Sequence, residues 1–168
     1  MQDAKDTFYV TLRDRVAAGN PARTVVVRGV VRPGVLVEEN ELTTAFVAVD
    51  AYVLRWGAMK VDSRGALPLV SMTCEVRYAT DGSAGAGGMD RGRLLAGMDV
   101  ELMAAVNARP QHVGKMNYAT AVNGGAAVAM GTNVFWGSVA LGPVVVEKER
   151  LARVATVEVF AYQEAGEL

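Results

Sequence analysis

The stretch TCEVRYATDGSAGAGGMDRGRLLAGMDVEL, residues 73–102, passes from a strand pattern through a glycine-rich loop into a helix pattern. On the strand side, apolar and polar residues alternate from Val70 onwards, which places one row of side chains in a core and the other towards solvent. The apolar row is Val70, Met72, Cys74, Val76 and Tyr78, and the polar row is Ser71, Thr73, Glu75 and Arg77. The alternation predicts a half-buried strand over 70–78.

The helix side of the same stretch carries apolar residues at spacings of three and four. Asp90 stands where it can cap the helix, and the sequence NARP at 107–110 ends it. The apolar residues are Leu94, Leu95, Met98, Leu102 and Val106. This spacing predicts an amphipathic helix that packs one stripe against the core.

The loop between strand and helix has the setting of a phosphate-binding loop but not its sequence. It lacks both G-x-x-x-x-G-K-[ST] and a G-x-G-x-x-G pattern in a βαβ unit, and Asp90 would repel a phosphate. Arg91 and Arg93 could contact an anion, although a solvated helix end or a subunit contact is favoured. We interpret the loop as a mobile connector.

Upstream, the chain begins with a helix pattern and continues with β-branched runs. Phe8, Leu12 and Val16 predict a helix over 6–18 that ends at GNP, residues 19–21. The next expected strands cover 25–31 and 35–37, broken at Pro33 and Gly34, and 46–56. Between the last two lie three acids, Glu38, Glu39 and Glu41, which we interpret as a solvated strand end or loop rather than a metal site.

Downstream, residues 114–131 are small, glycine-rich and almost uncharged, and predict a long Gly/Ala-rich loop or arm. If this segment is an arm, its deletion leaves the fold intact and weakens assembly. The chain closes with an apolar run broken by glycine and proline, and with a strand over 152–162. The expected fold is α+β, a mainly antiparallel sheet with two helices packed on one face, in one sandwich domain over residues 1–168.

The composition restricts the class of protein. The 168 residues include 17 basic and 18 acidic side chains, so the net charge of −1 provides no overall attraction to nucleic acid. A hydrophobic fraction of 51% is typical of a folded domain. Cys74 is single and is expected to be a buried hydrophobe in a reducing cytosol. Neither a signal peptide nor a membrane span is expected.

The residues that could perform chemistry do not form a recognisable set. His112 is the only histidine, and no serine lies in a G-x-S-x-G setting. The acid pairs Glu38 with Glu41 and Asp99 with Glu101 are of a kind common on protein surfaces. We therefore expect no catalytic residue, no metal, no cofactor and no enzymatic activity.

Four stretches together resemble the tail terminator, or tail completion, proteins of long-tailed bacteriophages and contractile tail-like particles. They are RPGVLVEENEL (32–42), PLVSMTCEVRYATDG (68–82), DRGRLLAGMDVELMAAV (90–106) and RVATVEVFAY (153–162). By order of elements, the resemblance covers residues 3–107 and 132–163, and segment 114–131 departs from the pattern.

The resemblance implies a structural protein of the virion tail, assembled in the host cytoplasm, that forms a hexameric ring on the tail tube. The ring would end tube polymerisation and join the tail to neck or head-completion proteins, with DNA passing through its opening without sequence recognition. Partners are then other copies of the chain, the tail tube protein and possible sheath and neck proteins, with no membrane. The candidate contact residues are Arg32, Glu38, Glu39, Glu41, Arg91, Arg93, Lys115, Asn117 and Tyr118.

Two alternatives to the tail terminator remain. One is another structural protein of the virion, such as a neck or connector protein or a tube-associated subunit. The other is a small-ligand-binding or nucleotide-binding enzyme domain that would use the loop at 81–93.

Overall fold

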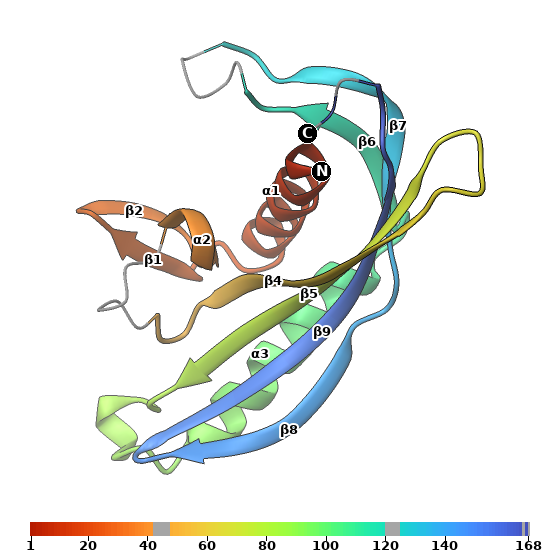
Figure 1. Cartoon of the computed structure of the whole chain (residues 1–168). Coiled ribbons are helices and arrows are strands. Elements are labelled where there is room, and N and C mark those ends of the chain that lie inside the picture. Colours follow the sequence, from red (N-terminus) through yellow and green to blue (C-terminus); the bar gives the residue numbers. More distant parts are fainter. Residues whose placement is uncertain (42–47, 120–124, 166, 168) are drawn as a thin grey trace.

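The computed structural model of the chain describes residues 1–41, 48–119, 125–165 and 167, apart from the side chains of Asn40 and Glu41. Figure 1 shows a strongly curved sheet with its helices on the inner side. The elements are α1 (Gln2–Gly19), β1 (Thr24–Val27), β2 (Val30–Pro33), β3 (Val35–Val37), α2 (Glu38–Glu41), β4 (Tyr52–Asp62), β5 (Leu69–Thr80), the 3-10 turn η1 (Ala84–Ala86), α3 (Arg91–Asn107), β6 (His112–Asn117), β7 (Val128–Trp136), β8 (Ala140–Glu147) and β9 (Arg150–Tyr162).

The main sheet has the strand order β3-β4-β5-β9-β7-β6, and β8 pairs with β9 beside this path. All neighbours are antiparallel except β3 and β4, which are parallel. At the centre, β5 and β9 pair along their whole length, from Leu69 opposite Tyr162 to Thr80 opposite Leu151. Strands β1 and β2 form a separate sheet that stands away from the main one (Figure 1).

Both long helices pack on the same face of the main sheet, so the predicted α+β sandwich is confirmed. Phe8 of α1 contacts two tryptophans edge to face, with ring centroids 5.9 Å from Trp56 on β4 and 5.5 Å from Trp136 on β7. The alternation predicted for the central strand is also observed, because its apolar row is buried against the helices. Burying each such side chain contributes about 1.5–3 kcal/mol.

The expected single strand over 25–31 is wrong, because this run is a hairpin. Arg28 and Gly29 form its turn with φ angles of 51° and 79°, and Val26 lies opposite Val31. Two-residue hairpin turns need positive φ at their central positions, which Asn-Gly and Asp-Gly satisfy most often. Because arginine instead of asparagine or aspartate occupies the first turn position, the turn is not recognisable in the sequence of this β-branched run.

The strand predicted over 46–56 is displaced along the chain. Residues 46–47 lie outside the described part, and β4 begins at Tyr52 and continues to Asp62. The acidic segment before it also differs from the predicted strand end or loop, since Glu38–Glu41 forms the short helix α2.

The predicted loop or arm at 114–131 is wrong at both ends. Residues 114–117 belong to β6 and residues 128–131 to β7, and these strands form a hairpin. Helix α1 fixes the hairpin, because the Met116 backbone N–H donates to Thr7 Oγ1 at 3.0 Å. These strands could not be predicted from the sequence, because their residues are small and show little alternation. Their position depends on contacts with residues distant in sequence.

Candidate functional site: two exposed β surfaces

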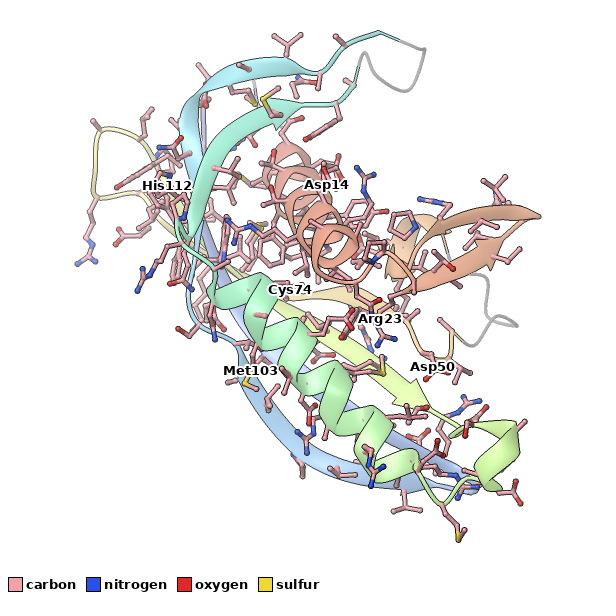
Figure 2. All side chains as sticks on the ribbon, turned by 180° about the vertical axis from the view of Figure 1, so that it is seen from behind. Asp14, Arg23, Asp50, Cys74, Met103 and His112 are labelled. Carbon is pink, nitrogen blue, oxygen red and sulfur yellow. The ribbon has the colours of Figure 1, made fainter. Side chains whose placement is uncertain are left out.

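His112 and Cys74 do not form a catalytic pair. Figure 2 shows them in different parts of the molecule, and Cys74 is fully buried in the core while His112 is exposed at the start of β6. The His112 ring instead packs on Phe135, with centroids 5.7 Å apart. Burial raises the pKa of the Cys74 thiol, which disfavours the reactive thiolate.

Two acids of α3 stabilise the fold from different sides of the helix. Asp99 accepts hydrogen bonds from the Tyr78 hydroxyl at 2.6 Å and from the Arg153 guanidinium at 2.7 Å. Glu101 accepts from Arg23 Nε at 2.6 Å and from Asn20 Nδ2 at 3.0 Å. Each carboxylate is therefore occupied by its own chain, so the two do not form a general acid and base pair.

The loop between β5 and α3 is held by its own side chains. Arg91 Nε donates to the Asp81 carbonyl oxygen at 3.0 Å, and Asp81 also pairs with Arg150 at 2.7 Å. The Asp90 carboxylate does not cap α3 as predicted, because it accepts from the Ser83 hydroxyl at 2.7 Å and from the Ser83 backbone N–H at 3.0 Å. This closed network corrects the expectation of a mobile connector.

Four of the predicted contact residues lie on β2 and α2. The Arg32 guanidinium donates to the Tyr9 hydroxyl at 3.3 Å, and Glu38 Oε2 is 3.9 Å from Arg77 Nη1. Glu39 is exposed and lies 4.0 Å from Lys5 Nζ, whereas the side chain of Glu41 is outside the described part. Arg91 and Arg93 lie elsewhere, on the first turn of α3.

The remaining three predicted contact residues are at the end of β6. Lys115 is fully buried, and its Nζ donates to the Tyr162 carbonyl at 2.6 Å and to Glu167 at 2.7 Å. It therefore has no exposed surface to offer a partner, in contrast to the prediction. Asn117 accepts from the Ala119 backbone N–H at 2.8 Å. Burial raises the pKa of half-buried Tyr118. The nine predicted residues thus lie in three separate places.

The β1–β2 hairpin exposes an apolar surface that sequence reasoning did not identify. Val26 and Val31 lie opposite each other on one face, and the side chain of Val31 is 66% exposed. Val30 is also exposed, directly after the turn residue Gly29 and opposite Val27. Val26 and Val31 thus form an exposed apolar pair on one face, of the kind that marks interaction sites, and Val30 exposes apolar surface on the other face.

A second exposed apolar surface follows the edge strand β8. Val144, Val145 and Val146 are consecutive and all exposed, with Val146 at 72%. Since side chains of a strand alternate between faces, both faces of this edge are apolar. Among the described strands, β8 pairs only with β9, so its outer edge has no strand beside it.

The two apolar surfaces lie on different sides of the molecule, the β1–β2 hairpin at one side and β8 at another (Figure 1). Both are runs of consecutive valines without alternation, VVV at 25–27 and 144–146. The sequence predicts a strand for the first run and an apolar run broken by glycine and proline for the second, without predicting that either is exposed. The signal that marks them is the charged turn beside each run, Arg28–Gly29 and Lys148–Glu149, which places the run at the end of an exposed hairpin.

The described residues contain neither a group of metal ligands nor a helix suited to a membrane. No three His, Cys, Asp or Glu side chains in residues 1–41, 48–119, 125–165 and 167 are grouped as metal ligands. Within the same part of the chain, no helix has both the length and the apolar character needed to cross a bilayer. Comparison of the sequence with protein-family models and with curated proteins gives no match in either.

Proposed function

We propose that this chain is a structural subunit of a phage tail, a tail terminator that forms a ring and ends the tail tube. The observation that supports it most is the presence of two exposed apolar β surfaces, Val26–Val31 and Val144–Val146, on different sides of one chain. When two different surfaces of a chain bind each other, copies associate head to tail, and a suitable rotation closes them into a ring. A two-fold dimer would use the same surface twice.

In this proposal the chain acts by binding neighbouring subunits and not by catalysis. Titratable side chains in the described interior, such as Asp99, Glu101 and Lys115, are bonded to partners of their own chain. They position helices and strands against one another. The loop at 81–93, where a nucleotide would bind in an enzyme, has its Arg91 bonded to the Asp81 carbonyl.

A ring also fits the small size of each apolar surface. Stable protein interfaces bury about 1,200–2,000 Å² in total, and a few valines per surface fall short of that. Ring closure adds avidity, because the last contact forms within one assembly. We therefore expect the free chain to associate weakly, forming a ring only at high concentration, and to form a stable ring on a tube end, where the tube supplies further contacts.

Electron microscopy of tail tubes with and without the purified chain tests this function. The expected result is a ring on one tube end, and tubes that no longer lengthen once they carry it. Rings found at the neck instead of the tube end would identify another connector protein. Tubes that elongate equally with the chain present would contradict the proposal.

A further inference from the structure

We infer that the two apolar surfaces bind each other: the β1–β2 hairpin of one copy docks along the free β8 edge of the next copy. This contact rests on the proposed ring, and it names the elements that form the ring's repeated interface. The partner on each surface is thus a second copy of this chain.

The hairpin has the properties of an element that is completed by a neighbour. Its strands β1 and β2 form a sheet of their own, and an isolated two-stranded hairpin is only marginally stable in water. It is fixed to the body at its base, where the Tyr52 backbone N–H of β4 donates to the Gly34 carbonyl at 2.8 Å. The distal part, with Val30 and Val31, faces solvent.

The β8 edge has the properties of a template for another strand. An exposed edge presents unpaired backbone groups, and proteins usually protect it with charges, proline or a bulge. In β8 the proline and the bulge lie in the first half, as Pro143 and a register shift between Leu141 and Val144, and a charge, Glu147, stands at the end of the strand. The second half, Val144–Val146, is apolar and regular.

The charges of the two surfaces are complementary. Residues 21–37 contain three arginines and no acid; Arg23 is paired with Glu101 of α3, whereas Arg28 is exposed at the hairpin turn. The end of β8 and its turn carry the exposed acids Glu147 and Glu149 with Lys148, and the next residue, Arg150, is paired with Asp81. Hairpin-to-hairpin contact would bring positive charges together, whereas hairpin-to-edge contact places Arg28 near acids.

Photo-crosslinking in the full chain tests the contact without assuming a strand register. Benzoylphenylalanine replaces Val30, which is 59% exposed, and copies with and without heavy nitrogen are mixed so that crosslinks between copies can be recognised. The expected crosslinks join position 30 to residues 140–149 of another copy. The matched control carries the same group at Val61, which is 53% exposed beyond the bulge of β4, and is expected to give none of them.

Charge reversal gives a second measurement on the same contact. Arg28→Glu and Glu147→Arg should each weaken self-association several-fold, and a mixture of the two variants should restore it because opposite charges meet again. Lys60→Glu, on the exposed part of β4, is the control and should leave association unchanged.

The outcomes separate this contact from the proposed function. Rings that persist while position 30 crosslinks elsewhere, or while β8 crosslinks to β8, overturn the contact and leave the ring proposal standing. A chain that forms no assembly, alone or on tubes, overturns both.

Discussion

The buried side chain of Lys115 joins three segments of the chain. Its ammonium joins β6 to the end of β9 through the Tyr162 carbonyl, and to Glu167, whose side chain is also buried. Removing one partner of a buried ion pair leaves the other charge uncompensated, at a cost of about 3–5 kcal/mol.

We therefore expect Lys115→Met to lower the free energy of unfolding by about 3 kcal/mol, measured by urea denaturation. Lys148→Met, in the exposed β8–β9 turn, is the matched control and should change stability by less than about 0.5 kcal/mol. Equal stability of the two variants would show that the buried cluster contributes little.

Glu164 makes stability depend on pH. Its carboxylate accepts from the Thr132 hydroxyl at 2.6 Å and from the backbone N–H groups of Gly131 and Thr132 at 3.1 and 2.9 Å. The Thr132 side-chain hydrogen bond is the main cause that holds the pKa of Glu164 below its ordinary value of 4.5. A lowered pKa in the folded chain stabilises it above pH 4.5, and that stability is lost as the pH falls through the folded value.

In thermal unfolding at a series of pH values, the wild type should therefore lose melting temperature on acidification below pH 4.5 more steeply than Glu164→Gln. Parallel curves for the two proteins would exclude this contribution.

At the scale of elements, the β5–α3 connection is a defined structure that depends on one glycine. Gly82 has a φ of 81°, and a Cβ there would lie 2.7 Å from Gly88 Cα and 2.8 Å from Arg91 Cγ. Gly82→Ala should destabilise the fold by about 1–3 kcal/mol, because both the backbone conformation and the space oppose a side chain.

This loss corresponds to a fall in melting temperature of about 2–4 °C per kcal/mol for a chain of this size. Gly85→Ala is the control, since a Cβ there meets nothing within 4 Å, and it should melt close to the wild type. If both variants melt alike, the loop is not rigid.

Because residues 114–131 contribute to the β6–β7 hairpin, their deletion is expected to destabilise the fold, whereas deletion of an arm would leave the fold intact. Deleting residues 114–131 would remove Lys115 and the Met116 contact with Thr7, and would shorten the strand that carries Val134 and Trp136 into the core. The deletion should therefore lower the melting temperature and the strand signal in circular dichroism. An unchanged spectrum and melting temperature would restore the arm interpretation.

The elements that the sequence predicts well are those with strong local periodicity. Helices α1 and α3 and strands β5 and β9 show clear spacing of apolar residues, and each is found close to its expected bounds. Strand β6 could not be predicted in this way, because its buried residue is Lys115. That position becomes favourable through the Tyr162 carbonyl and Glu167, which are both distant in sequence.

The candidate site was less predictable than the fold for a related reason. Charged residues such as Glu38 and Arg91 were expected at contacts, but in the folded chain they lie beside charged or carbonyl groups of the same chain. The exposure of the valines could not be predicted, since composition does not distinguish a buried valine run from one at an unpaired edge. Exposure depends on which strands pair, and pairing is set by the whole fold.

At the scale of the whole molecule, the account depends on self-association through two different surfaces. Sedimentation equilibrium of the purified chain over a concentration range up to about 1 mM, which detects contacts as weak as about −4 kcal/mol, measures this directly. We predict a monomer at low concentration and a closed ring, expected to contain six copies, at high concentration. Val31→Lys or Val145→Lys should abolish the ring without lowering the melting temperature. A chain that remains monomeric at every concentration, or that stops at a two-fold dimer, would contradict the account.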